Sequence, residues 1–271
     1  MERIVSVRPG IGATASILQG RELRLARVVV DQPTLIVVAC GRKRLVNGGG
    51  EWVLDSGGAV VVAGGQAFDV INTPGADGGY RASWLVFDAR VLARYGAERP
   101  EVPAVSAAVA LPRLEPDFLD AYGRAVAAVT AGDALPAPVA EQRLREVLAW
   151  LGLYGARPAC APGGSVAARV RDLFAADPAR GWTAADAARH LAMSEPTMRR
   201  RLAEEGQSAS RILIDVRMHR ALMLLQSTDA PVTRIAFDVG YDSPSRFAVR
   251  FRERFGHSPT AIRAGVLESV E

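Results

Sequence analysis

Three consecutive arginines, Arg199, Arg200 and Arg201, lie in the stretch SEPTMRRRLAEEGQS, residues 194–208. The arginine guanidinium is planar and carries several donors, which suits phosphate groups and the edges of guanine bases. A run of charges on a helix is also typical of a face that meets only solvent. The elements around the arginines decide between nucleic-acid contact and simple solvation.

The arginines belong to a predicted helix with one apolar side. Ser194 is a favourable N-cap residue, and Pro196 is tolerated in the first helical turn. Met198 and Leu202, four residues apart, predict the buried side. A shorter capped helix over residues 183–191 precedes it, separated by the tight turn LAMS. Two short helices joined in this way predict a helix-turn-helix unit.

The three arginines point in different directions on this helix. At about 100° per residue, Arg199 and Arg200 share the outward face with Pro196 and are placed to reach base edges. Arg201 lies on a flank, where it suits a DNA phosphate or an ion pair with Glu205 within the helix.

The same arrangement recurs about 49 residues later, in PVTRIAFDVGYDSPSRFAVRFRERFG, residues 231–256. Ser243 is the predicted cap of a helix that begins at Pro244. The buried side of that helix is predicted to consist of Phe247, Phe251 and Phe255. Its outward half and flanks carry Ser245, Arg246, Val249, Arg250 and Arg252.

One long helix of about nineteen residues, ASRILIDVRMHRALMLLQST, is predicted between the two units. Such a helix is roughly 28 Å long. Helices held about one DNA turn apart, roughly 34 Å, can enter successive major grooves on one face of the duplex. A solvated face does not explain two capped, arginine-bearing helices at this interval, so the sequence predicts contact with double-stranded DNA.

The region of about residues 165–265 resembles the AraC/XylS family of bacterial transcription regulators. The resemblance rests on LAMSEPTMRRRLAEEG, on the RMHRAL helix and on RIAFDVGYDSPSRFAVRFRERFGHSPTAIR. It implies base contacts from Pro196, Arg199, Arg200, Ser245, Arg246 and Val249. We expect the neighbouring contacts to the DNA backbone from Ser194, Thr197, Arg201, Ser243, Arg250 and Arg252.

The N-terminal part of the chain reads differently, as many short strands. Between residues 14 and 88, valine-rich runs alternate with turn signals such as NGGG and PGADGG, a pattern typical of a β-sandwich or barrel. Residues 33–75 resemble the cupin-like regulatory domain of many AraC/XylS members, which implies control by a small effector or a partner protein. The expected fold class is α+β, with a cupin-like β-barrel over residues 1–112.

Helical spacing begins near residue 115 and predicts a hairpin of two helices over residues 113–155. This hairpin either covers the barrel or packs on a second copy of the chain. The resemblance implies the second use, so the dimer contacts are predicted at Leu144, Val147, Leu148 and Leu151. Residues 156–164 are predicted to form a linker. It joins the barrel and hairpin to the DNA-binding domain, residues 165–271, which contains the two helix-turn-helix units.

An enzyme is not expected. The three histidines, His190, His219 and His257, all lie in the helical part of the chain, so residues 1–112 lack the histidines of a cupin metal site. No nucleophile–base pair or phosphate-binding loop is evident. The sequence therefore predicts neither a metal nor a cofactor, and the effector residues stay unassigned.

The composition bears on the kind of DNA-binding protein and on its cellular compartment. The net charge is only +4, which argues against the alternative of an architectural DNA-binding protein that relies on many backbone contacts. Two cysteines and the lack of a long apolar run favour a reducing cytoplasm without a membrane anchor. The expected function is sequence-specific transcription regulation by a homodimer, with activation through RNA polymerase as the outcome that the family resemblance implies.

Overall fold

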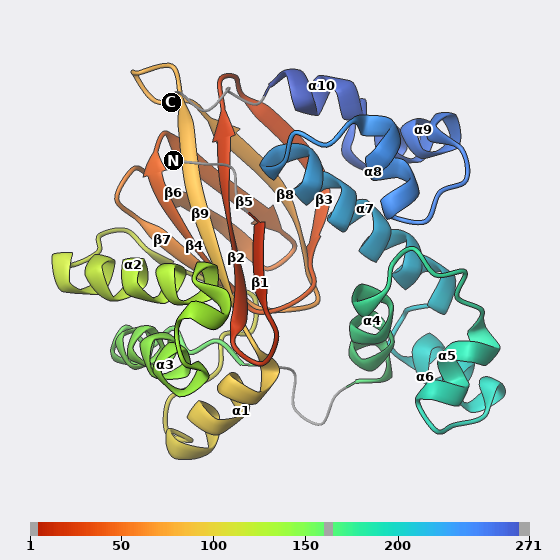
Figure 1. Cartoon of the computed structure of the whole chain (residues 1–271), viewed down its shortest axis with the longest axis horizontal. Helices are drawn as coiled ribbons and strands as arrows, with labels where there is room; N and C mark the ends of the chain where they lie inside the picture. Colours follow the sequence, from red (N-terminus) through yellow and green to blue (C-terminus); the bar gives the residue numbers. More distant parts are fainter. Residues whose placement is uncertain (1–4, 160–164, 266–271) are drawn as a thin grey trace. The chain divides into compact units, whose positions relative to one another are not determined.

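The computed structural model describes residues 5–159 and 165–265. Contacts within the chain divide it into two compact units, one built mainly from the chain up to residue 160 and the other from residues 161–225 and 229–261. The first unit contains the strands, and the second contains helices (Figure 1).

The strands of the first unit form two antiparallel sheets. The larger sheet has the order β1-β2-β9-β4-β7-β10 and contains β1 (Val5–Arg8), β2 (Gly12–Gln19), β4 (Thr34–Cys40), β7 (Ala59–Val62), β9 (Tyr80–Phe87) and β10 (Ala108–Leu111). The smaller sheet has the order β3-β8-β5-β6 and contains β3 (Leu23–Val30), β5 (Arg42–Asn47), β6 (Gly50–Leu54) and β8 (Gln66–Thr73).

Alternation along the strands explains why the sheets pack face to face. In β8, Phe68 and Val70 are buried while Ala67 and Asp69, the residues that precede them, are exposed, since successive strand residues point to opposite faces. The prediction of a cupin-like β fold is confirmed. The two sheets stay separate, so the unit is a jelly-roll-like sandwich and not a closed barrel.

Four strands and one helix were not predicted: β1, β2, β5, β10 and α1 (Ala89–Glu98). Strand β5 reads RKRLVN and begins with three basic residues, so its first half lacks the apolar alternation that marks a strand. Strand β2, GATASILQ, is made largely of small residues. Pairing with neighbouring strands, which the local sequence does not reveal, places both in the sheets.

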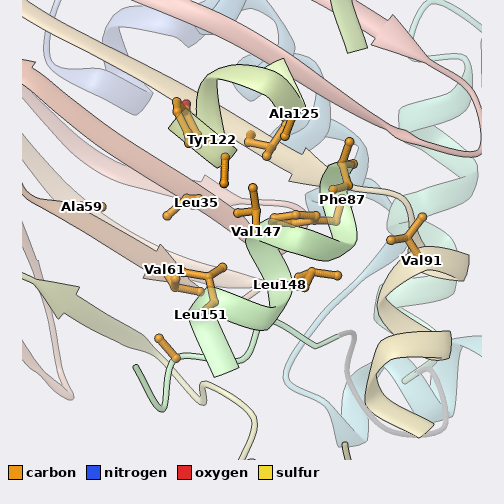
Figure 2. Packing of buried hydrophobic residues seen from close by; sticks show 14 of the residues in the cluster. Leu35, Ala59, Val61, Phe87, Val91, Tyr122, Ala125, Val147, Leu148 and Leu151 are labelled. Carbon is orange, nitrogen blue, oxygen red and sulfur yellow. The ribbon is translucent and has the colours of Figure 1, made fainter. Parts of the chain in front are cut away.

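Helices α2 (Pro116–Thr130) and α3 (Ala137–Leu153), joined through the short η1 helix (Gly132–Ala134), form the predicted hairpin. Together with α1 they pack on one face of the larger sheet and share a single hydrophobic core with it. Figure 2 shows this packing, with side chains from β4, β7 and β9 against those of α2 and α3.

This core corrects the predicted dimer contacts. Leu144, Val147, Leu148 and Leu151 are each 0% exposed within a single copy of the chain. They pack against the sheet and the other helices, as Figure 2 shows for the last three. A second copy therefore has no access to them, and the alternative that the hairpin covers its own β domain is the correct one.

Residues 165–265 fold into helices, as predicted. They are α4 (Val166–Ala176), α5 (Ala184–His190), α6 (Glu195–Glu204), α7 (Ala209–Ser227), α8 (Val232–Asp238), α9 (Pro244–Phe255) and α10 (Pro259–Ala264). The long helix α7 has the nineteen residues expected from the sequence.

Part of the predicted linker is ordered against the first unit. Ala156 is fully buried, and the carbonyl of Arg157 accepts a hydrogen bond from the Val105 N–H at 3.0 Å. Residues 160–164, the rest of the predicted linker, lie outside the described residues. Within the described ranges, no helix combines the length and the hydrophobicity of a membrane span.

Candidate nucleic-acid interface

The first helix-turn-helix unit consists of α5 and α6. Thr183 caps α5, and its hydroxyl accepts from the Asp186 N–H at 3.0 Å while donating to the Asp186 carboxylate at 2.6 Å. Hydrogen bonds from Thr183 are the main cause that lowers the pKa of Asp186. Ser194 caps α6, where its hydroxyl oxygen accepts from the Thr197 N–H at 3.3 Å. Both predicted caps are confirmed.

The turn between α5 and α6 depends on one residue with a left-handed backbone. Ala192 has φ = 54°, and the corresponding residue of the second unit, Gly240, has φ = 85°. This region is costly for a residue with a Cβ and free of strain for glycine. Each turn thus begins with a left-handed residue, and only the second has the residue type that the conformation favours.

The buried side of α6 is the one predicted. Met198 and Leu202 are buried against Ala187 and Ala188 of α5. The small side chains of the two alanines let the helices approach closely. This packing fixes the rotation of α6 and so determines which of its residues face outward.

Arg199 and Arg200 both project into solvent, with side chains 69% and 71% exposed. Arg199 pairs with Glu195 at 2.5 Å, and Arg200 lies 4.0 Å from Glu204. Exposed pairs of this kind contribute little to stability. Both guanidinium groups are therefore available to a ligand that offers stronger acceptors, such as base edges or phosphates.

Arg201 is also exposed, on the flank of α6. Its predicted alternative partner within the helix, Glu205, caps another helix instead. The two carboxylate oxygens of Glu205 accept from the backbone N–H groups of Val166 and Ala167 at the start of α4, each at 2.9 Å. This contact attaches α4 to the end of α6, and sequence reasoning did not identify it.

Helices α8 and α9 form the second unit. Phe247, Phe251 and Phe255 are buried, as predicted, and neighbouring rings lie 5.6 and 4.7 Å apart between centroids. The hydroxyl oxygen of Ser243 caps α9 by accepting from the Arg246 N–H at 3.3 Å. Gly256 ends the helix with φ = 79°, a frequent helix-terminating conformation.

The outward face of α9 differs chemically from that of α6. Ser245, Arg246, Val249, Arg250 and Arg252 are all exposed. The caps Ser194 and Ser243 are 49 residues apart, so Val249 occupies the position that Arg200 occupies in the first unit. Val249 is 58% exposed, which makes it an apolar group on an otherwise polar face.

Helix α7 connects the two helix-turn-helix units. Ile212 and Val216 of α7 pack into the core of the first helix-turn-helix unit. From the second unit, Arg254 of α9 pairs with Asp215 of α7 at 2.9 Å, with side chains only 13% and 10% exposed. Because this pair is nearly buried, it restricts the orientation of α9 relative to α7 more than an exposed pair would.

Arg217 of α7 makes a further connection. Its Nε donates to the Pro178 carbonyl at 2.9 Å and its Nη2 donates to the Arg180 carbonyl at 3.0 Å. The same guanidinium lies 5.8 Å from the centre of the Tyr241 ring, in the turn of the second unit. One side chain thus joins the loop before α5 to the turn before α9.

Sequence reasoning missed Asp215, Arg217 and Arg254, although a signal exists for two of them. Asp215 lies three residues after Ile212, and Arg254 three residues after Phe251, so each occupies a helical position on the buried side. A charge at a buried position usually has a partner of opposite charge. Their pairing was therefore accessible from the sequence, but the role of Arg217 was not.

Histidines and acidic residues are dispersed in this unit. His190 is exposed beside Trp182, with ring centroids 5.2 Å apart. Across the described part of the chain, no group of three or more histidine, cysteine, aspartate or glutamate side chains is arranged to hold a metal ion.

Comparison with known proteins identifies the helical region. A family model described as a helix-turn-helix domain matches residues 187–265. The transcriptional activator FapR of Escherichia coli is 32% identical over 102 residues, which are 38% of this chain and 39% of that protein. The regulator YdeO of Escherichia coli is 36% identical over 98 residues, 36% of this chain and 38% of that protein. The similarity thus spans less than two-fifths of the length of either relative.

Solved structures extend the comparison to the whole fold. ToxT of Vibrio cholerae superposes with a TM-score of 0.68 at 11% identity, covering 95% of this chain and all of that chain. A structure of ToxT with a bound unsaturated fatty acid gives a TM-score of 0.67 at 12% identity, covering 95% and 97% of the two chains. Residues 187–265 of this chain therefore form a helix-turn-helix domain similar to that of these transcription regulators.

Proposed function

We propose that this protein is a sequence-specific DNA-binding transcriptional regulator that inserts α6 and α9 into successive major grooves. The observation that carries the proposal is the repeated unit on α7, in which two capped helices bury their apolar sides and expose arginine-bearing faces. At 1.5 Å per residue, α7 is roughly 28 Å long, close to the pitch of B-form DNA.

In this proposal the two helices read different chemistry. Arg199 and Arg200 present donors suited to guanine, whereas Val249 presents an apolar surface suited to the methyl group of thymine. Ser245 and Arg246 at the start of α9 supply polar contacts beside it. The predicted backbone set, including Arg201, Arg250 and Arg252, would fix the register of the protein on the duplex.

Sequencing the DNA fragments that the purified full chain retains from its own genome tests the function. A regulator enriches a few sites that share a motif with two half-sites about one helical turn apart. The alternative, an architectural DNA-binding protein, retains fragments with little sequence preference at every salt concentration. Failure to retain any duplex at low salt would overturn both.

We further propose that the N-terminal domain places DNA binding under the control of an effector. Support comes from the likeness of the whole fold to ToxT, which has been solved with an unsaturated fatty acid. FapR is named as a transcriptional activator, and we also propose that this protein activates transcription, through contact with RNA polymerase. Transcription in vitro from a retained promoter, with polymerase added, would test the sign of regulation.

Homodimerisation remains a proposal, with a different surface from the one first predicted. Val139 and Leu153 of α3 are 43% and 77% exposed. They are fourteen residues apart on α3 and so lie within about 40° of each other around its axis. Light scattering of the wild type and of Leu153→Glu would test whether this side of α3 joins two copies. A wild type that stays monomeric at micromolar concentration, with and without DNA, contradicts it.

A further inference from the structure

Four polar side chains lie between the two sheets of the N-terminal domain. Gln19, Lys43, Asn72 and Tyr80 are 0%, 5%, 1% and 0% exposed. Gln19 and Tyr80 are cross-strand partners in the larger sheet, and Lys43 and Asn72 are cross-strand partners in the smaller one. We refer to these four residues as the inter-sheet cluster.

The inter-sheet cluster interrupts rows that are otherwise apolar. Lys43 shares the inward face of β5 with Leu45, and Asn72 shares the inward face of β8 with Phe68 and Val70. The strand neighbours of these two polar residues are Leu54 and Leu23, which are 1% exposed. The cluster therefore occupies positions where alternation calls for apolar side chains.

A short relay of hydrogen bonds fixes the orientation of the amides. The Lys43 ammonium donates to Asn72 Oδ1 at 2.9 Å, so Asn72 Nδ2 points the other way and donates to Gln19 Oε1 at 3.1 Å. This second bond crosses from one sheet to the other. It leaves the amide nitrogen of Gln19, which is a donor, at the end of the relay.

The inter-sheet cluster has more donors than acceptors. Gln19 Nε2 and the Tyr80 hydroxyl are buried and have no hydrogen-bond partner among the described residues. Lys43 contacts the neutral Asn72 amide, and its Nζ lies 5.8 Å from the centre of the Tyr80 ring. In the described chain, no carboxylate pairs with this ammonium. Buried donors without acceptors and a buried unpaired cation are both costly.

Another buried cation in the same domain, Arg8, has hydrogen-bond acceptors for its charged group. Arg8 is 8% exposed, and its guanidinium donates to the carbonyls of Ala128 and Leu135 at the two ends of the η1 connection. Arg8 thus acts as a structural clamp with carbonyl acceptors. Lys43 has no such backbone carbonyl acceptors among the described residues. It is also the only lysine among the 33 lysine and arginine residues of the chain.

The protonation states favour an acidic ligand. Burial lowers the pKa of Lys43 to about 8, so the amine is still largely protonated at neutral pH. Burial raises the pKa of the Tyr80 phenol, which therefore remains a donor. A carboxylate offers two acceptor oxygens and one negative charge, which match these unsatisfied groups.

We propose that the inter-sheet cluster binds the carboxylate group of a small organic acid. Lys43 supplies the charge, while Tyr80 and Gln19 donate to the carboxylate oxygens. The inference rests on the proposed effector control and gives it a site and a ligand class. Asn72 acts as a positioning residue, because it holds both Lys43 and Gln19 in place.

The single lysine makes a direct measurement possible. In full-length protein labelled with ¹³C only in lysine, the side-chain Cε signal belongs to Lys43 alone. We would titrate this sample with aliphatic monocarboxylates from butanoate to palmitate, with benzoate, and with the primary amide of each acid. The expected result is a saturable shift of the Cε signal with at least one carboxylate, and none with the matching amide.

Two tyrosines of the domain provide a matched pair of variants. Tyr80→Phe removes a hydroxyl that lacks a partner in the free protein, so it is expected to leave the fold intact and to weaken binding of that carboxylate roughly tenfold or more. Tyr122→Phe also removes a buried hydroxyl, but this one hydrogen-bonds Ser83 at 2.8 Å in a different part of the domain. It is expected to leave the carboxylate affinity unchanged.

The proposal is overturned if no acid of the series shifts the Lys43 signal, as when ordered water alone satisfies the cluster. It is equally overturned if the amides bind as well as the acids, or if Tyr80→Phe and Tyr122→Phe bind alike. The comparison of acid with amide uses only the wild type, so it does not depend on the variants folding. DNA binding by the wild type is measured on the same sample with and without the acids, and its absence under both conditions would count against the proposed function instead.

Discussion

At the scale of single residues, the two DNA-facing helices carry different groups at one equivalent position. Arg200 of α6 and Val249 of α9 have the same relation to their caps and are both largely exposed. An arginine there favours guanine, and a valine favours the methyl group of thymine. The two halves of the proposed site are therefore expected to differ in sequence, and the protein to bind in one orientation.

Removing single arginines tests this division of roles. Arg200→Ala is expected to cost roughly 1–3 kcal/mol of binding free energy and to relax the preference at one base pair. Arg201→Ala, its neighbour on the flank, is expected to weaken all sequences about equally and to reduce the salt dependence. Binding titrations on matched and mismatched duplexes at several salt concentrations measure both effects. Identical behaviour of the two variants would refute the assignment.

Lys43 has a second consequence at this scale, in the pH dependence of stability. Its pKa is about 8 in the folded protein, below its ordinary value of 10.5. Between these values the unfolded chain binds more protons than the folded one, so this residue makes stability rise with pH. Burial of the charged amine lowers the free energy of unfolding by about 3 kcal/mol, and this cost is fully present below pH 8.

The variant Lys43→Met isolates that contribution. From pH 8 to pH 10.5, the free energy of unfolding of the wild type is expected to rise relative to the variant by about 3 kcal/mol. Urea titrations of both proteins across this range give the difference, in which the other titrating groups cancel. A constant difference would mean that Lys43 keeps an ordinary pKa and is reached by water.

At the scale of elements, the turns of the two helix-turn-helix units give opposite predictions. Ala192→Gly is expected to stabilise the protein by about 1 kcal/mol, since the residue is exposed and has φ = 54°. Gly240→Ala is expected to destabilise it, because a Cβ there would lie 2.6 Å from Arg217 Nη2 and 2.9 Å from the Ala179 carbonyl. Thermal unfolding of the two variants provides the comparison. A loss of stability in Ala192→Gly would show that the turn is not strained.

The hairpin of α2 and α3 gives another prediction at this scale. Leu148 is completely buried in the core of one copy, whereas Leu153 on the same helix is 77% exposed. Leu148→Ala is therefore expected to lower the free energy of unfolding by about 2–5 kcal/mol. Leu153→Ala should change it by less than about 0.5 kcal/mol. If Leu148→Ala instead dissociated a dimer and left each subunit as stable as before, the packing described for α3 would be wrong.

The sequence predicts these elements unevenly, for physical reasons. Caps, helical apolar stripes and the repeat on α7 are local patterns, and they were confirmed with Ser194, Ser243 and the three phenylalanines of α9. The row on α3 was correctly recognised as apolar, but spacing alone does not say whether a sheet or a second copy covers it. Strand β5 escaped notice because Lys43 stands at an inward position, and only the tertiary structure shows the polar partners that it meets there.

At the scale of the whole molecule, the DNA-reading part is expected to work by itself. The core of the first helix-turn-helix unit draws on residues 166–216, and the second has its own aromatic core on α9. A fragment of residues 165–271 should therefore fold and bind the DNA sites retained by the full chain. Circular dichroism and binding titrations check this, with a fragment of residues 1–159 as the control. An unfolded fragment would show that the helices need the β domain.

The restriction of lysine to one buried position has a consequence for chemical modification. Acetyl groups and other acyl groups are transferred in cells to lysine ε-amines, and they erase the positive charge of the residue. Every cationic side chain proposed to meet DNA is an arginine, and the only ε-amine lies between the sheets with 5% of its surface exposed. Acyl donors that accumulate when metabolism changes would therefore leave the cationic DNA-facing surface intact. Mass spectrometry after treatment with acetyl phosphate should find the helical part of the chain unmodified and its affinity for DNA unchanged.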